Sequence, residues 1–156
     1  MDGVTDVAAV VESAAESLIG VLDGARLDQS PAVPPTQLRV LAIVAANRHT
    51  NMNRLAEALN VVPSSASRLC DRLEATGLLR RVPDPRDRRE VRLMLTAPAH
   101  RLLDDLRERR RQALAEVLDR MPATARQELV RALSAFGEAA AGQEAAQDTE
   151  ADRRTA

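Results

Sequence analysis

Apolar side chains recur every three or four positions in residues 5–28, at Val7, Val11, Ala14, Leu18, Val21 and Ala25. This spacing is typical of an amphipathic helix. Prolines at positions 31, 34 and 35 end it, because proline cannot continue a helix. The next run, QLRVLAIVAAN, is apolar around most of its circumference. It predicts a buried helix with Thr36 as its N-cap.

Two short helices follow, joined by a tight turn. Asn51 can cap the helix MNRLAEAL, and Asn60 tolerates the left-handed backbone that ends it. The dipeptide VV forms the turn. Pro63 then suits the first position of a helix that continues as SSASRLCDRLEAT and closes at Gly77. Two helices separated by three or four residues constitute a helix-turn-helix unit.

The second of these helices has an apolar face and a polar face. Its polar face carries short hydroxyl groups and guanidinium groups, at Ser64, Ser65, Ser67, Arg68 and Arg72. Small serines let the backbone approach base edges closely, and a helix N-terminus attracts phosphate. We therefore expect these five side chains to contact DNA. The alternative is an ordinary solvated helix surface.

The runs LLRRV and VRLMLT, on either side of the turn-rich segment PDPRDRRE, predict a two-stranded hairpin. In the second run Val91, Leu93 and Leu95 alternate with Arg92 and Met94, which is the period of a strand with one buried face. A hairpin that directly follows a recognition helix is a wing.

The tip of this wing is rich in arginine, with Arg86, Arg88 and Arg89 close together. Such arginines can enter a narrow minor groove, where negative potential is concentrated. Asp84 and Asp87 are expected to support the wing, because a carboxylate can hold a neighbouring arginine in one rotamer by a charge-assisted hydrogen bond. The alternative is a plain solvated charge run.

The remaining sequence predicts two more helices and a tail. Thr96 caps a long helix that runs to about Arg120, and a helix after Pro122 carries an apolar stripe that includes Leu133. Residues 142–156 lack such a stripe and are expected to be disordered. The expected fold is mainly α with a small β-hairpin, in a single domain spanning residues 1–141.

The charge distribution changes the significance of a net charge of only -1. Residues 1–35 carry six acidic residues and one Arg, whereas residues 48–101 carry eleven Arg and six acidic residues. The central segment, residues 48–101, is therefore basic and the segments on either side of it are acidic, which suits a nucleic-acid partner. All basic side chains are Arg, whose forked donors fit phosphates and guanines, although a GC-rich genome would give the same bias.

Composition excludes several other classes of protein. No run approaches 18 apolar residues, and the acidic N-terminus is unlike a secretory signal, so we expect a cytoplasmic protein. His49 and His100 are far apart in sequence, and no catalytic motif, metal-ligand spacing or phosphate-binding glycine loop accompanies them. An enzyme, a metal site and a cofactor are therefore not expected.

These pieces, in this order and spacing, resemble the MarR family of bacterial transcription regulators (multiple antibiotic resistance regulators). The resemblance covers residues 5–141 in layout and is specific over 53–96. It rests on LAEALNV, the run from Pro63 to Arg81, the D-x-R-D-x-R segment from Asp84 to Arg89, and the closing Leu95–Thr96.

The resemblance implies a winged helix-turn-helix domain over about 36–96 and a homodimer held by helices over about 5–28 and 97–141. It also implies binding to a pseudo-palindromic operator in double-stranded DNA, usually as a repressor, with release by a small phenolic or lipophilic ligand. By carry-over, Ser64, Ser65, Ser67 and Arg68 lie at the major-groove reading positions, and the three wing arginines at the minor groove.

Two departures from the family pattern affect these expectations. Val62 stands where the family usually has a capping Ser or Thr, which removes a cap worth ~1 kcal/mol. Oxidation-sensing relatives use a Cys near the N-terminal helix, whereas Cys70, the only cysteine here, falls on an apolar helix face and is expected to be inert core.

The sequence is compatible with two alternatives to a ligand-released DNA-binding repressor. The chain could be a ligand-independent winged-helix regulator, since its effector-binding segments offer no aromatic residue to stack a phenol. It could be a helical dimeric interaction module without DNA binding, although that reading leaves the basic centre unexplained. The sequence does not distinguish a repressor from an activator, and it identifies neither the operator nor ligand-binding residues.

Overall fold

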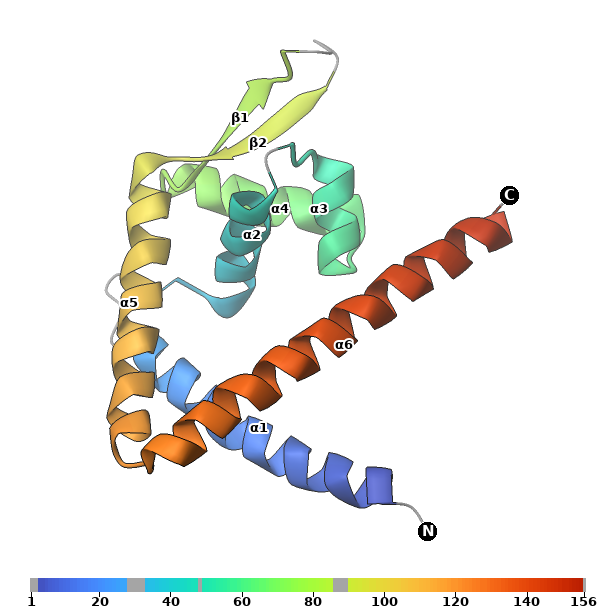
Figure 1. Cartoon of the computed structure of the whole chain (residues 1–156). Coiled ribbons are helices and arrows are strands. Elements are labelled where there is room, and N and C mark those ends of the chain that lie inside the picture. Colours follow the sequence, from blue (N-terminus) through green and yellow to red (C-terminus); the bar gives the residue numbers. More distant parts are fainter. Residues whose placement is uncertain (1–2, 28–32, 48, 86–89, 156) are drawn as a thin grey trace. The chain divides into compact units, whose positions relative to one another are not determined.

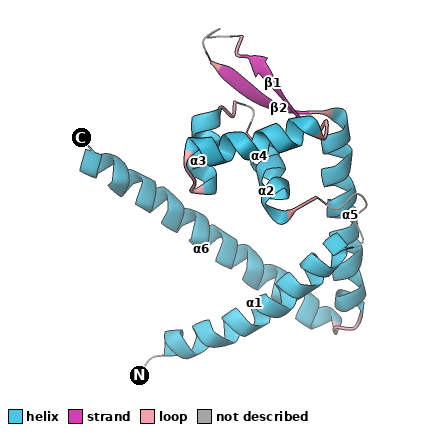
Figure 2. Cartoon of the chain, turned by 180° about the vertical axis from the view of Figure 1, so that it is seen from behind, coloured by secondary structure: helices cyan, strands magenta, loops and turns pink. Residues whose placement is uncertain are grey.

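The computed structural model describes residues 3–27, 33–47, 49–85 and 90–155. Within these ranges the elements are helices and one antiparallel hairpin, in the order α1 (Gly3–Leu27), α2 (Pro35–Ala46), α3 (Met52–Leu59), α4 (Pro63–Ala75), β1 (Leu79–Pro83), β2 (Val91–Leu95), α5 (Ala97–Asp119) and α6 (Ala123–Thr155) (Figures 1 and 2). The expected fold class, mainly helical with a small hairpin and a winged helix-turn-helix, is confirmed. The chain divides into two compact units, Met1–Ala113 and Leu114–Ala156.

The core of the first unit is aliphatic and is built by α2, α3, α4, the hairpin and the first half of α5. Leu41, Leu55 and Leu73 come from three different helices, and each is completely buried. Burying a leucine side chain contributes ~1.5–3 kcal/mol. Ala99 and Leu103 of α5 close the same core. The first unit is therefore held together by packing of aliphatic side chains rather than by aromatic contacts.

Asparagine residues start and end α3 as the sequence predicts. The backbone N–H of Arg54 donates to Asn51 Oδ1 at 3.0 Å, which caps the first turn. Asn60 adopts φ 54, the left-handed conformation that ends the helix. Thr96 also caps α5, because Ala99 N–H donates to its Oγ1 at 3.4 Å. These three ends are fixed by local chemistry.

The expected cap on α2 is wrong. The helix begins at Pro35 with Pro34 as its N-cap, and no side chain caps it. Thr36 instead lies inside the first turn. Proline at the first helical position has no N–H to satisfy and already holds the helical φ, so the helix can begin two residues earlier than expected.

The hairpin is extended on one side by the segment before α3. The strands pair from Leu79↔Leu95 at the base to Pro83↔Val91 near the tip. The N–H of Leu93 donates to the Thr50 carbonyl at 2.9 Å, and Asn51 forms a bridge with Arg92. This second pairing, between β2 and the segment before α3, was not expected from the sequence. It ties the middle of β2 to the start of the helix-turn-helix.

The helix α6 continues to Thr155, past Gly142 where the sequence predicts the ordered chain to end. Residues beyond Gly142 are mostly Ala, Glu, Gln, Asp and Arg, and Ala, Glu, Gln and Arg are strong helix formers. A segment rich in helix formers can be helical without an apolar stripe. The apolar stripe therefore ends near Gly142, whereas the helix continues to Thr155. No helix in the described part of the chain is long and apolar enough to cross a membrane.

Replacing Val62 with Ser should stabilise the protein. Val62 is the N-cap of α4, is 62% exposed, and has the extended backbone (φ -68, ψ 147) that a capping serine adopts, yet it supplies no side-chain hydrogen bond. We expect Val62→Ser to be ~1 kcal/mol more stable than the matched variant Val62→Ala in urea unfolding. Equal stability of the two variants would show that the cap position is satisfied by other groups.

The Cys70 thiol is completely buried on the inner face of α4. Burial raises its pKa to about 11, the nearby Arg81 guanidinium acts in the opposite direction, and Asp71 and Glu74 raise the pKa further. The thiol is therefore protonated at neutral pH. Because the thiolate is the reactive form, Cys70 lacks the character of a redox sensor.

Cys70 gives a clean test of pH-dependent stability. The unfolded chain releases the thiol proton from about pH 9, whereas the folded chain holds it to about pH 11, so the free energy of unfolding should fall as pH rises through this window. The chain contains neither Lys nor Tyr, so no other side chain is expected to titrate there. Urea unfolding at pH 8, 9.5 and 10.5 should show this fall in the wild type and not in Cys70→Ala.

Candidate nucleic-acid interface

The two helices of the helix-turn-helix meet at a tight turn held by backbone hydrogen bonds. The N–H groups of Asn60 and Val61 donate to the carbonyls of Glu57 and Ala56, at 2.9 and 3.0 Å. Pro63 then begins α4 without losing a donor. Ala66, Cys70 and Leu73 are buried in the core, so the opposite face of α4 is exposed to solvent.

The five predicted residues of α4 are not equally exposed. Ser64, Arg68 and Arg72 lie on the outer face, one turn apart, and are exposed. Ser65 and Ser67 are half-buried. The residues with full access to a partner are thus one serine near the helix N-terminus and two arginines further along. The positive end of the α4 helix dipole adds an attraction for anions at this site.

Arg81, which is not among the site residues expected from the sequence, connects the wing to α4. Its guanidinium forms ion pairs with Asp71, at 2.8 Å, and with Glu74, while its backbone N–H donates to Glu74 Oε1 at 3.0 Å. The guanidinium also donates to the carbonyl and to Oγ of Ser67, at 3.4 and 3.3 Å. One side chain of β1 therefore contacts three residues on one side of the recognition helix.

The electrostatics of this cluster keep Arg81 charged. Burial disfavours the guanidinium charge, but the hydrogen bond to Asp71 and the charges of Glu74 and Asp71 outweigh it and raise the pKa of Arg81 above its usual range. Two carboxylates face one guanidinium, so the cluster has a net negative charge. Arg81 is therefore held by two carboxylates of α4, whereas Arg68 and Arg72 are exposed.

A pattern in the sequence could have identified Arg81. Alternate residues of a strand face the same side of the sheet, so Arg81 shares a face with buried Leu79. It also pairs directly with buried Leu93. Its neighbour Arg80 faces the other side and is exposed. An inward-facing arginine needs partners, and Asp71 and Glu74, three residues apart on α4, were available.

The pairing of the hairpin continues past the two strands toward the wing tip. Asp84 N–H donates to the Glu90 carbonyl at 2.9 Å and continues the pairing of β1 with β2 by one step. Asp84, expected to support the wing, is half-buried at this point. The predicted tip residues Arg86, Asp87, Arg88 and Arg89 lie outside the described residues.

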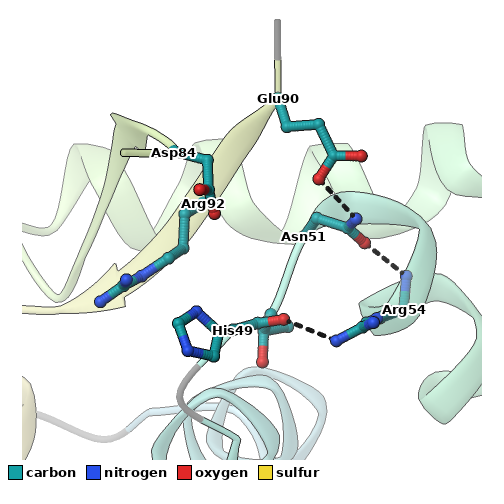
Figure 3. Close-up of a pocket in the computed structure, with 7 residues that line it drawn as sticks. His49, Asn51, Arg54, Asp84, Glu90 and Arg92 are labelled. Carbon is teal, nitrogen blue, oxygen red and sulfur yellow. Dashed lines mark hydrogen bonds between the residues drawn. The ribbon is translucent and has the colours of Figure 1, made fainter. Parts of the chain in front are cut away.

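A cleft lies between the hairpin, on the side nearer its tip, and the link from α2 to α3 (Figure 3). It encloses about 400 Å³ and is lined by His49, Thr50, Asn51, Arg54, Asp84, Glu90 and Arg92. Asn51 donates to Glu90 at 3.4 Å, and the Arg54 guanidinium donates to the His49 carbonyl at 3.2 Å. These bonds join the start of α3 to the wing on one side and to the preceding link on the other.

The potential metal ligands in the described residues are dispersed. No group of three or more His, Cys, Asp or Glu side chains there could hold a metal ion. His49 and His100 are both exposed and lie on different elements, the link before α3 and the first turn of α5. The arrangement instead offers hydrogen-bond donors and positive charge on one helix face, which suits a polyanion.

Comparison with known proteins places this architecture in a family. Residues 33–90 match the sequence model of the MarR family. The chain is 35% identical over 68 residues to the HTH-type transcriptional repressor MdtR of Bacillus subtilis, a match that covers 44% of each protein. The aligned region thus spans less than half the length of this curated relative.

Solved structures extend the similarity to nearly the whole chain. Rv1404 from Mycobacterium tuberculosis is 30% identical in sequence to this chain, and its crystal structure superposes with a TM-score of 0.80. The alignment covers 90% of this chain and 96% of Rv1404. A MarR family protein from Bacillus stearothermophilus shares the fold, at 21% identity and a TM-score of 0.76, and covers 88% of this chain and 95% of its own. The chain belongs to the MarR family of DNA-binding transcriptional regulators.

Proposed function

We propose that this protein is a repressor that binds a pseudo-palindromic operator as a homodimer and leaves it when a small ligand binds. The observation that carries the proposal is the outer face of α4, where Ser64, Arg68 and Arg72 are exposed one turn apart beside the wing. A major groove admits one helix and presents a distinct pattern of donors and acceptors for each base pair. A helix of this composition is suited to enter it.

The proposed contacts fall into two kinds. Ser64, Ser65, Ser67 and Arg68, in the first turns of α4, would read base edges, because the N-terminal part of a recognition helix lies deepest in the groove. Arg72 and the wing arginines Arg86, Arg88 and Arg89 would bind phosphates or the minor groove. Phosphate contacts position a protein on DNA without reading sequence. Asp84 and Asp87 would support the wing.

A homodimer is supported by exposed apolar side chains on α1 and α6. Val4, Val7 and Val11 are 84%, 60% and 46% exposed, at the spacing of a single helix face. Leu133 and Phe136 of α6 are 47% and 64% exposed. Apolar stripes of this length are rarely left in water. A second copy of the chain, related by a two-fold axis, would cover them and would place two recognition helices on half-sites ~10 bp apart.

From these surfaces we assign DNA binding and dimerisation to different parts of the chain. Residues of about 36–96 form the DNA-binding head, and helices over about 5–28 and 97–141 form the dimer frame. On this assignment the acidic flanks do not contact DNA, which reconciles a net charge of -1 with a polyanionic partner. The protein acts as a regulator and not as an enzyme.

Release by a small phenolic or lipophilic ligand is the part of the proposal that rests on the family resemblance. A ligand-independent regulator is the second candidate. It is favoured by the composition of the chain, in which Phe136 is the only aromatic residue. A thermal-shift screen of phenolic acids, coupled to measurement of DNA release, distinguishes the two.

The wing arginines should contribute affinity without sequence preference. Replacing Arg86, Arg88 and Arg89 together with Ala should weaken binding to operator and non-operator DNA alike. The slope of log K against log salt concentration should become shallower by about 0.9 for each phosphate that the variant no longer neutralises. Fluorescence anisotropy at several salt concentrations measures both effects.

The matched control removes three exposed arginines from α5, as Arg101→Ala, Arg107→Ala and Arg111→Ala. It changes the net charge by the same amount outside the proposed interface, and we expect a small effect on the slope. Unchanged operator affinity in the wing variant would refute the wing assignment. Absence of DNA binding by the wild type at low salt would favour an interaction module instead.

Charges placed in the proposed dimer interface should dissociate the dimer. The double variant Leu133→Glu with Phe136→Glu would bury two unpaired carboxylates, at a cost of about 3 kcal/mol or more, which is roughly a hundredfold in the dissociation constant. Sedimentation velocity measures the mass. Arg131→Glu changes the charge by the same amount on the opposite side of α6 and should remain dimeric. A monomeric wild type would refute the proposal.

A further inference from the structure

Ser67 differs from the other two serines of α4 because its hydroxyl is already engaged by the wing. Arg81 reaches across from β1 and donates to Ser67 Oγ at 3.3 Å and to the Ser67 carbonyl at 3.4 Å. In the described part of the chain, the side chains of Ser64 and Ser65 make no comparable bond. Ser67 is also half-buried, whereas Ser64 is exposed.

The hydrogens of Arg81 Nη2 account for this arrangement. This nitrogen carries two hydrogens, and it faces three acceptors. The bond to Asp71 Oδ1, at 2.8 Å, is the short one, so the second hydrogen is shared between the two oxygens of Ser67. Glu74 binds the other guanidinium nitrogen and the backbone N–H of Arg81. The guanidinium is thus fixed at both ends of its fork and cannot rotate away from Ser67.

A hydroxyl that accepts from a cation is left with its own hydrogen to donate. Serine has one O–H donor and two lone pairs, and Arg81 occupies one of the lone pairs. Hydrogen bonds in a chain polarise one another, so accepting from a guanidinium makes the Ser67 O–H a stronger donor. Asp71 and Glu74 more than balance the charge of Arg81. The cluster therefore has this directional effect on the Ser67 hydroxyl but adds no general attraction for phosphate.

We propose that Arg81 is a positioning residue that presets the Ser67 hydroxyl as a donor toward an acceptor on a base edge in the major groove. The inference rests on the proposed function of α4 and assigns a specific chemistry to one of its residues. Guanine presents O6 and N7 as acceptors, adenine presents N7, and thymine presents O4, whereas cytosine presents an amino donor. Ser67 should therefore disfavour cytosine at the base it reads.

Selection of binding sites from a randomised DNA library tests this directly. The wild type, Ser67→Ala and Arg81→Gln are compared by the base preference at each operator position. One operator position should lose its preference against cytosine in both variants, by roughly three- to tenfold, the size expected for one hydrogen bond. The double variant should lose no more at that position than either single variant, because both changes remove the same contact.

Arg80→Gln is the matched control. It removes the same charge from the adjacent residue, whose side chain is exposed and faces the other side of the strand. We expect it to keep the base preference of the wild type at every position. A loss of preference in this control equal to that in Arg81→Gln would overturn the proposal, because general electrostatics would then explain the effect.

A purely structural role for Arg81 predicts a different result. Arg81→Gln would then weaken binding to all sequences equally, with the preference at the Ser67 position unchanged, and the proposal would be wrong. It would also be wrong if Ser67→Ala weakened all sequences alike, since Ser67 would then bind a phosphate. Failure of the wild type to enrich any sequence would refute the proposed DNA-binding function itself.

Circular dichroism and thermal unfolding establish that each variant is folded. If Arg81→Gln does not fold, Arg81→Lys is used to test the role of Arg81 in base preference. Lysine keeps the positive charge between Asp71 and Glu74 but lacks the planar fork that reaches Ser67 at the same time. We expect Arg81→Lys to fold and to lose the preference against cytosine. Retention of that preference in Arg81→Lys would overturn the proposal.

Discussion

The geometry of the DNA-binding head depends on the contact between Arg81 and the acidic side of α4. The hairpin has two strands, and a two-stranded hairpin is marginally stable when nothing packs against it. Leu79, Leu93 and Leu95 bury one face of the hairpin in the core. Arg81 adds a directional connection by pairing with Asp71 and Glu74. Apolar packing holds the wing near the helix, and this ion-pair cluster sets how the two elements are aligned.

A second connection joins β2 and Glu90, which precedes it, to the link before α3. Thr50 pairs with Leu93, and Asn51 both caps α3 and donates to Glu90. Asn51 therefore couples the start of the helix-turn-helix to the strand that leads from the wing tip. With Arg81 on β1 and Asn51 beside β2, each strand is tied to a different helix of the head. Such cross-links matter because a misplacement of about 1 Å would separate donors from base edges, given the steep distance dependence of hydrogen bonds.

The sequence predicted the elements of the head well because their ends are set by local chemistry. Asn51, Asn60, Pro63 and Thr96 act on residues one to four positions away, so a short window contains the full cause. Where two local rules competed, as at Thr36 beside a proline, the predicted N-cap was two residues away from the observed one. The order of these elements was also sufficient to identify the family, because the spacing of the helix-turn-helix and wing motifs is itself specific.

The contacts of the site were less accessible to sequence reasoning, because they join residues far apart in the chain. Arg80 and Arg81 are chemically identical neighbours, and only the side of the strand on which each lies distinguishes the exposed Arg80 from the half-buried, ion-paired Arg81. Likewise Ser64, Ser65 and Ser67 form one polar group in the sequence, but Arg81 reaches only Ser67. The proposed reading surface is therefore not three equivalent hydroxyl groups. It is one exposed serine, one half-buried serine and one serine whose orientation the wing controls, so a change that moves the wing would also change what the helix can read.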